Sequence, residues 1–335
     1  MFFVLKKGKT IPKIFFLTFL YSWTLLIGCV TQEGTMITEQ HPHSPKNSIK
    51  FSEKQYQIYD ATGKKTSLNK IIDQIGLVHV VFLGEMHNDP VAHYLQEVIL
   101  RKITNRYWTN AYTSKRRQIV LSMEMFERDV QMILDEYLLN IIDETYFLSC
   151  ARPWRNYYHD YHPLLKYAKK KSLRVLAANA PRRYVHRVAK QGNEALNDLS
   201  AIARTWIAPL PIRPPSEKMK QNLRTIHKQG GLMISPHENI SEKSYLLDAQ
   251  NLWDATMAYS INEELSSTHD ALILHLNGFF HTLSGSGIPE HLRHYRPDVR
   301  MMVINIVRND SFPKFNPQLK NSGDYVIITD PNIGK

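Results

Sequence analysis

The chain has 335 residues, a formal net charge of +11 at neutral pH and two cysteines, Cys29 and Cys150. Two cysteines exclude a disulfide-stapled scaffold, so the fold must depend on a hydrophobic core, which a chain of this length can form. The positive charge suits anionic ligands or a membrane surface, but no basic and aromatic recognition motif accompanies it, so we expect no nucleic-acid partner.

The N-terminus has the pattern of an export signal. A basic region is followed by a mostly apolar run, residues 14–27, that is short for a membrane span. The run ends in Leu26-Ile-Gly-Cys29, which resembles the lipobox of bacterial lipoproteins. We therefore expect residues 1–28 to be a lipoprotein signal peptide and Cys29 to carry the lipid. The alternative is an uncleaved anchor with a chance cysteine.

The residues after the lipobox predict where the folded part is held. Val30 follows the cysteine, which by analogy favours the outer membrane over retention at the inner one. Residues 29–52 are polar and contain Thr, Gln, Ser and Pro, as in a flexible tether. We expect an outer-membrane lipoprotein whose folded part faces the periplasm.

Short apolar runs alternate with longer segments of helical periodicity along the rest of the chain. The predicted buried strands are residues 78–83, 119–122, 173–178, 271–276 and 301–307, and residues 325–329 predict an edge strand. The predicted helices include residues 90–102, 129–142, 163–171 and 245–265. This alternation predicts an α/β fold, with a mainly parallel sheet and helices on both of its faces.

One long segment interrupts this alternation. Residues 182–265 contain no convincing strand, include a proline-rich break at 208–215 and end in a long helical pattern. We interpret the segment as a small helical subdomain inserted into the α/β domain, which then comprises residues 53–181 and 266–335. On the last predicted helix, Gln250 and Asp254 share a face, either lining a pocket or lying in solvent.

Polar residues follow four of the predicted strands, where parallel strands would bring them to one edge of the sheet. Together with a histidine on the first helix, they form a candidate set of Glu85, His87, His93, Glu124, Asn179 and His281. Carboxylates and imidazoles that converge in this way can bind a divalent metal or transfer protons. The alternative is structural: the carboxylates cap helices and the histidines bond to backbone carbonyls.

Several segments resemble the ChaN-like family of haem-binding, iron-regulated bacterial lipoproteins. The matching motifs are Leu83-Gly-Glu-Met-His-Asn-Asp-Pro90, Glu124-Met-Phe-Glu127, Asn179-Ala-Pro-Arg182 and Gly278-Phe-Phe-His281. The resemblance follows family order and covers nearly all of the folded part, roughly residues 75–306, and the lipobox agrees with it. The family resembles a wider group of Gly-x-x-His proteins that includes the Tiki/TraB and erythromycin-esterase-like proteins.

The resemblance implies a lipid-anchored α/β protein with a small helical domain that binds haem through a tyrosine. It also implies a homodimer that encloses two haems and a role in iron acquisition, with an outer-membrane haem receptor as a further partner. We expect a binding protein without turnover.

An aromatic stretch, residues 154–162, fits the haem prediction. Phenolate is a hard anionic ligand for ferric haem, and spacing does not choose among Tyr157, Tyr158 and Tyr161. His159 and His162 are the accompanying candidates, and Arg182 and Arg183 are candidates for pairing with the propionates. The alternative is an aromatic-rich helix that packs against the sheet.

Two other functions remain open from the sequence. A metal-dependent hydrolase or peptidase of the Tiki-like type would use the strand-end Glu and His residues around a divalent ion. A structural lipoprotein would use the same residues to brace the sheet. A serine nucleophile is not indicated, because the chain has no Gly-x-Ser-x-Gly motif.

Overall fold

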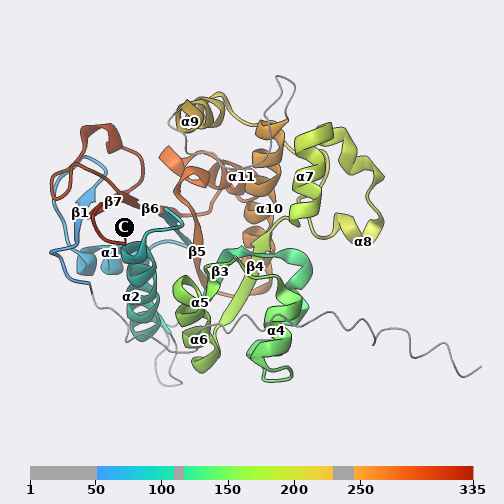
Figure 1. Ribbon diagram of the computed structural model, residues 1–335, viewed down its shortest axis with the longest axis horizontal. Helices are drawn as coiled ribbons and strands as arrows, with labels where there is room; N and C mark the ends of the chain where they lie inside the picture. The colour runs from blue at the N-terminus through green and yellow to red at the C-terminus, as the bar shows by residue number, and fades with distance from the viewer. Residues whose placement is uncertain (1–50, 109–116, 229–244, 335) are drawn as a thin grey trace, which may run out of the picture. The chain divides into compact units, whose positions relative to one another are not determined.

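The computed structural model describes residues 51–108, 117–228 and 245–334, and Figure 1 shows their arrangement. The predicted signal peptide, Cys29 and nearly all of the predicted tether lie outside the described residues. None of the helices in these ranges combines the length and the apolar character needed to cross a bilayer.

A seven-stranded sheet forms the centre of the fold. In spatial order its strands are β1 (Tyr56–Asp60), β7 (Tyr325–Thr329), β6 (Met301–Arg308), β2 (Val80–Glu85), β5 (Ala271–Gly278), β3 (Gln118–Glu127) and β4 (Arg174–Asn179). Only β1 runs antiparallel to its neighbour, and all other pairs are parallel. The predicted fold class is confirmed.

The edge of the sheet differs from the prediction. Residues 325–329 do form a strand, but β7 pairs with both β6 and β1, so β1 is the edge strand. The prediction was wrong because β1, with the sequence Tyr-Gln-Ile-Tyr-Asp, is short and only partly apolar. Its place is fixed by antiparallel pairing with β7 rather than by a continuous hydrophobic run.

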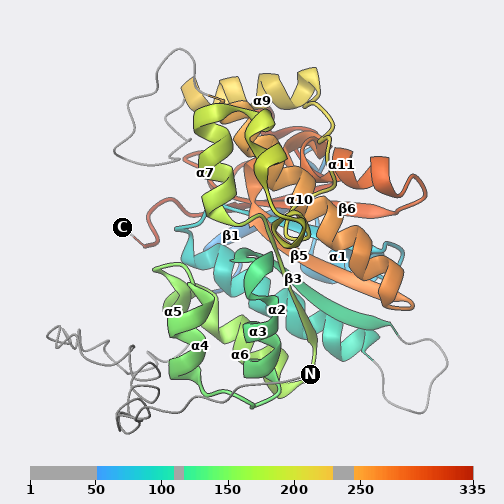
Figure 2. The same ribbon diagram turned by 90° about the vertical axis from the view of Figure 1, so that its right-hand side faces the viewer.

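Helices cover both faces of the sheet, as predicted. The helices α1 (Leu68–Ile75), α2 (Pro90–Tyr107), α3 (Gln131–Leu138), α4 (Glu144–Ala151), α5 (Tyr157–Asp160) and α6 (His162–Lys170) share one core with one side of the sheet. The helices α10 (Leu246–Ser267) and α11 (Ile288–Tyr295) pack on the other side. The two helical layers lie on opposite sides of the strands in Figure 2. Alternate residues of β2 show the division, because Val81 and Leu83 face the first core whereas Val80 and Phe82 face the second.

The helix boundaries follow local signals. Asp89 caps α2 by accepting a 2.9 Å hydrogen bond from the Val91 amide, and Pro90 occupies the first turn. The predicted helix at 129–142 is shorter, because a 3₁₀ turn precedes α3 and α3 ends at Leu138. Between β4 and β5 the described residues contain α7 (Arg182–Gln191), α8 (Ala201–Arg204), α9 (Glu217–Lys228) and α10, without a strand.

Candidate functional site

The sheet brings the predicted polar residues to one edge. β2, β5, β3 and β4 are consecutive and parallel, so their carboxyl ends are neighbours. A register shift in β3 between Met123 and Glu127 interrupts its pairing beside Glu124. The Glu124 carboxylate accepts a 2.7 Å hydrogen bond from the Gly278 amide, and the Asn179 side chain donates to the Glu124 carbonyl at 3.0 Å.

Gly84 explains why β2 and the segment after β5 meet so closely. A Cβ atom at this position would lie 2.9 Å from the Cα atom of Phe279, which is closer than real side chains approach. The absence of a side chain therefore lets the Gly278-Phe-Phe-His281 turn lie against the end of β2.

Glu85 is the centre of a first buried hydrogen-bonded set. One carboxylate oxygen accepts from the Tyr161 hydroxyl at 2.5 Å and contacts His87 Nδ1 at 2.8 Å. The other oxygen accepts from the Gln96 amide and lies 3.3 Å from His93 Nδ1. Glu85 is 1% exposed, so these partners replace the water that its charge would otherwise require.

The charges of this first set stabilise one another. Burial alone would raise the pKa of Glu85, but the nearby histidines, His93 foremost, hold it well below its usual range. Burial would lower the pKa of His93, yet Glu85 and then Asp160 outweigh it and raise the pKa to about 9. The set therefore contains a carboxylate and an imidazolium as a buried ion pair at neutral pH.

His281 is the centre of a second buried set. Its Nδ1 bonds to the Asp254 carboxylate and lies 2.7 Å from the Gln250 side chain, while its Nε2 lies 3.4 Å from Glu124. Gln250 and Asp254 are thus buried against the strand ends, and a solvated face is excluded. Burial would lower the pKa of His281, but Glu124 and Asp254 raise it to about 10. Burial raises the pKa of Asp254 to about 6, although His281 opposes the rise.

His87 lies near both sets and is their most exposed member, with 36% of its side chain accessible. Its ring packs edge-on against Trp154, with 4.9 Å between ring centroids, and approaches Phe280. Burial would lower its pKa, but Glu85 and Glu124 raise it. We call the two sets together with His87 the strand-end cluster. His87 is the member of this cluster that is accessible to solvent.

The geometry does not support the predicted divalent metal. Each carboxylate of the two sets already bonds to imidazole, amide or hydroxyl groups of the protein. Within the described ranges, no group of three or more His, Cys, Asp and Glu side chains is arranged to hold a metal ion. What the arrangement provides is charge pairing and directional hydrogen bonding at the sheet edge.

The three predicted iron-ligating tyrosines lie in different surroundings. Tyr157 packs in the core against Phe126 and Phe147, and its buried hydroxyl has no hydrogen-bond partner. Tyr161 is fully buried and donates to Glu85. Tyr158 is partly buried beside His162. Burial raises the pKa of all three phenols, most strongly those of Tyr157 and Tyr161.

The remaining predicted haem residues are spread over two helical regions. His159 is exposed, and His162 pairs with Glu144 at 3.0 Å. Arg183 binds the Asp129 carboxylate at 2.5 Å, whereas the exposed Arg182 forms no ion pair with any described residue. Arg183 and Arg152, which lies two residues before the aromatic stretch, both bind the Asp129 carboxylate.

A group of exposed apolar side chains on α3, on α4 and in the segment between them was not predicted from the sequence. Met132, Leu139, Ile141 and Tyr146 are 71%, 69%, 66% and 66% exposed. The two helices are neighbours that pack on the same core through Leu134, Tyr137 and Phe147 (Figure 2). Met132 and Leu139, seven residues apart, point away from this core. We call these four residues the α3–α4 face. In the sequence they could have been recognised as apolar residues that do not follow the helical periodicity of the buried ones.

Comparisons with known proteins agree with this fold. A family model described as haem-binding uptake, Tiki superfamily, ChaN, matches residues 71–292. Among solved structures, the chain is similar to ChaN of Campylobacter jejuni, which is described as binding haem cofacially. The two are 22% identical with a TM-score of 0.61, over 83% of this chain and 98% of that chain. This likeness shows that the two chains share a fold.

Other similarities are weaker. An erythromycin esterase mutant in its open conformation is 11% identical, with a TM-score of 0.43, over 82% of this chain and 83% of that chain. Among curated proteins, RETICULATA-RELATED 5, chloroplastic, of Arabidopsis thaliana is 23% identical over 265 residues, or 74% of this chain. The chain spans about a third of that relative's length, 34%.

The raised pKa values of the buried histidines predict how stability depends on pH. An unfolded histidine titrates near 6.5, whereas His281 titrates at about 10 and His93 at about 9 in the folded chain. Their stabilisation is complete below pH 6.5 and is lost as the pH rises toward 10. We expect the free energy of unfolding, measured in urea, to decrease over this range by on the order of 1–3 kcal/mol.

The His281→Gln variant isolates this effect. It should be less stable than the parent chain at pH 6.5, and the difference should shrink toward pH 10. Replacing the exposed His269 with Gln is the matched control and should leave the pH profile unchanged. A stability difference between His281→Gln and the parent that stays constant from pH 6.5 to 10 would contradict the buried ion pair.

Proposed function

The chain belongs to the ChaN family of haem-binding uptake proteins in the Tiki superfamily, and on that premise we propose a lipid-anchored protein that binds haem through a tyrosine between two copies. The family predicted from the strand-end motifs is confirmed. Haem binding and uptake in general follow from family membership. The iron ligand, the dimer and the anchor are the parts that we propose.

The α3–α4 face is where the described residues best fit a haem. A porphyrin is flat and largely apolar, and Met132, Leu139 and Ile141 are exposed apolar side chains in the same helix pair as the exposed Tyr146. Exposed apolar side chains gathered in this way indicate a surface that is covered by a ligand or a partner. This single observation carries the assignment.

Tyr146 is the tyrosine that we propose as iron ligand. A phenol must lose its proton to ligate ferric iron, and burial opposes this in Tyr157 and Tyr161 by raising their pKa values. Tyr161 is also engaged with Glu85. The Tyr146 hydroxyl lies in solvent and bonds to no described residue. Tyr158, which is partly buried, is the alternative among the predicted ligands.

Cationic groups lie next to one end of the α3–α4 face. Asp129, three residues before Met132, binds both Arg152 and Arg183, at 2.7 and 2.5 Å. Arg182 is adjacent and has no ion pair with any residue that the structure describes. In our proposal Arg182 pairs with a haem propionate while the apolar face covers the macrocycle.

Two copies of the chain would cover the haems from both sides. A face with four exposed apolar side chains leaves the opposite side of a bound haem in water, and a second copy related by twofold symmetry removes that exposure. The cofacial binding described for Campylobacter jejuni ChaN supports such an arrangement here. The proposed role is to hold haem for iron acquisition at the outer membrane.

The strand-end cluster has a bracing role in this proposal. Its carboxylates are satisfied by protein donors, and its charges are buried, apart from the partly exposed His87. Tyr161 connects it to the helices that carry the aromatic stretch. The cluster therefore fixes the scaffold that supports α3 and α4 rather than the iron itself.

A hemin titration tests the ligand. We expect the full-length protein in detergent to develop a saturating Soret band, and Tyr146→Phe to weaken binding at least about tenfold by removing the only oxygen ligand on this face. Tyr245→Phe, at another exposed tyrosine, is the matched control and should bind as the parent does. Loss of binding in Tyr158→Phe with full binding in Tyr146→Phe would assign the iron to the predicted stretch instead.

Light scattering during the same titration tests the dimer. Leu139→Glu places a charge in the centre of the α3–α4 face and should abolish a hemin-dependent increase from one copy to two, because an unpaired charge resists burial. Ile202→Glu, at an exposed apolar residue on α8, is the control and should still dimerise. A hemin-saturated protein that remains monomeric would refute the shared-haem arrangement.

Membrane fractionation tests the anchor. We expect the parent protein to partition with outer membranes and to incorporate radiolabelled palmitate, and Cys29→Ser to lose both because it lacks the thiol that receives the lipid. Cys150→Ser retains Cys29 and is the control. Palmitate incorporation that persists in Cys29→Ser would contradict the lipobox assignment.

A further inference from the structure

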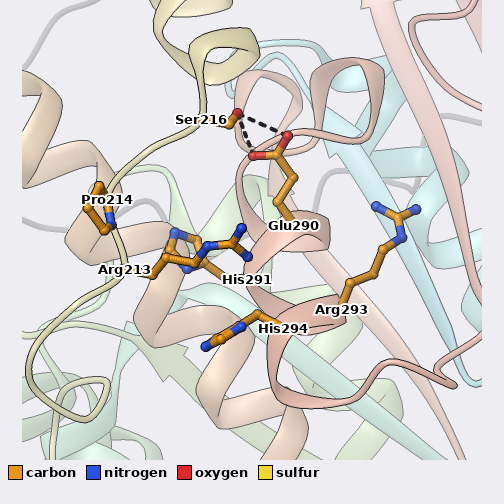
Figure 3. Close-up of a pocket in the computed structure, with 7 residues that line it drawn as sticks. All are labelled: Arg213, Pro214, Ser216, Glu290, His291, Arg293 and His294. Atoms are coloured by element: carbon orange, nitrogen blue, oxygen red, sulfur yellow. Dashed lines mark hydrogen bonds between the residues drawn. The ribbon is translucent and has the colours of Figure 1, made fainter.

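A cavity of about 340 Å³ lies on the side of the sheet covered by α10 and α11. It is lined by α11 and by the segment that leads into α9, far in sequence from the α3–α4 face (Figure 3). Its volume is within the range of small-molecule sites and much larger than a simple ion requires. None of the residues proposed for haem binding lines it.

Two arginines make the cavity cationic. Arg213 and Arg293 come from different segments, and in Figure 3 their guanidinium groups lie on either side of Glu290. Neither forms an ion pair with any described residue, and the one hydrogen bond from Arg293, to the Gly285 carbonyl, is long at 3.5 Å. Both arginines are exposed, so their two guanidinium groups are accessible to an anionic ligand from solvent.

Glu290 gives the cavity an acceptor beside these cations. Ser216 holds the carboxylate, with its hydroxyl 2.8 and 3.0 Å from the two oxygens, and the same hydroxyl accepts from the Met219 amide at the start of α9. One hydroxyl proton cannot satisfy all the lone pairs of a carboxylate. A ligand that brings hydroxyl donors next to its anionic group would satisfy the rest, which a bare anion cannot do.

His291 adds a second acceptor at the floor of the cavity. The Asn251 amide nitrogen donates to the Arg213 carbonyl at 2.8 Å, so its oxygen must accept from His291 Nε2 at 2.9 Å. The proton therefore resides on Nε2, and Nδ1 is an acceptor. His291 is 4% exposed, and Nδ1 has no hydrogen-bond partner. An unsatisfied buried acceptor is costly, so a donor at this position would be stabilising.

The charge state of His291 agrees with this tautomer. Burial lowers its pKa to about 4, and the nearby Arg213 and His294 add to the decrease, so the ring is neutral at physiological pH. In the view of Figure 3 the Arg213 side chain overlaps the ring, and its charge is close enough to lower the pKa of His291. Because Nδ1 is buried, a ligand hydroxyl reaches it only when a neighbouring side chain turns toward the anion.

The two guanidinium groups favour a phosphoryl group over a single carboxylate. Each guanidinium presents a planar fork of donors that binds two oxygens, and a carboxylate has oxygens for only one such fork. A phosphate monoester has three free oxygens and a charge near −2, so it can engage both forks. Glu290 and His291 then remain for hydroxyl groups on the rest of the molecule.

We propose that this cavity binds a small soluble phosphate monoester that carries hydroxyl groups, of the size of a sugar phosphate. Arg213 and Arg293 hold the phosphoryl group, and Glu290 and the His291 Nδ1 atom accept from the hydroxyls. The site is separate from the proposed haem face and does not depend on haem.

Calorimetric titration of the full-length protein in detergent tests the proposal. The probes are glucose 6-phosphate, inorganic phosphate, glucose and malate. We expect glucose 6-phosphate to bind one per chain, at least about tenfold tighter than each other probe, because only it offers both the dianion and the hydroxyls. Hemin-loaded and hemin-free protein should bind it equally.

Substitutions of the lining residues test whether the ligand binds in this cavity. Arg213→Gln and Arg293→Gln should each weaken glucose 6-phosphate at least about tenfold, the loss expected for charge-assisted hydrogen bonds. Glu290→Gln should reduce the preference over inorganic phosphate. Arg106→Gln, at an exposed arginine on α2, is the matched control with the same charge change and should bind as the parent does. Unchanged melting temperatures establish that the variants fold.

Three results would overturn the proposal. The first is absence of glucose 6-phosphate binding, or binding that both arginine variants retain. The second is malate binding tighter than glucose 6-phosphate, which would make the ligand a dicarboxylate. The third is binding to phosphatidylglycerol vesicles, dependent on Arg213, that exceeds binding to glucose 6-phosphate, because the phosphoryl group would then belong to a lipid.

Discussion

The burial of the Glu85 carboxylate is the constraint on which the rest of the structure depends. A charged group at 1% exposure is tolerated only when the protein replaces its water with donors and opposite charge. Its partners come from three places: the turn after β2, helix α2 and the end of α5. Each of these segments must therefore occupy one position relative to the sheet. Removing any partner would leave a charge or a donor buried without compensation.

The second buried set extends this constraint to the opposite layer. His281 follows β5, Glu124 belongs to β3 and Asp254 belongs to α10, so one imidazole connects two strands with a helix on the other side of the sheet. Burial raises the pKa of Asp254 to about 6, and Asp254 and Glu124 share the one imidazolium of His281, so the three groups titrate as a coupled set. Together the sets fix both helical layers against the carboxyl edge of the sheet.

The sequence predicted the sheet better than the site. The continuous apolar runs and the cap at Asp89-Pro90 were sufficient for the central strands and for the start of α2, because these signals are local. β1 was missed because its pairing with β7 joins segments more than 260 residues apart. The strand-end residues were predicted to meet, since parallel topology alone requires it. Their individual partners were not, because spacing does not tell which hydroxyl or amide reaches which carboxylate.

The tyrosines show this limit most clearly. Tyr157, Tyr158 and Tyr161 are adjacent in sequence and equivalent in composition, yet one is in the core, one is partly buried and one donates to Glu85. Tyr146 lies outside the aromatic stretch, so the clustering of aromatic residues did not single it out. Its exposure depends on how α3 and α4 pack together, which is a property of tertiary structure. Composition therefore drew attention to the aromatic stretch, but it could not show which of its phenols are buried and which are accessible.

A brace made of buried charges has one property that an apolar core lacks. Hydrophobic contact stabilises any arrangement that excludes water, whereas an ion pair with satisfied hydrogen bonds stabilises one register and one orientation. At this sheet edge, a helix shifted by one turn would separate His93 from Glu85 or Asp254 from His281. The helices that flank the edge are thus positioned by directional bonds. The backbones of α3 and α4, whose buried residues Leu134, Tyr137 and Phe147 belong to the same core as Tyr157, are held in place by this packing.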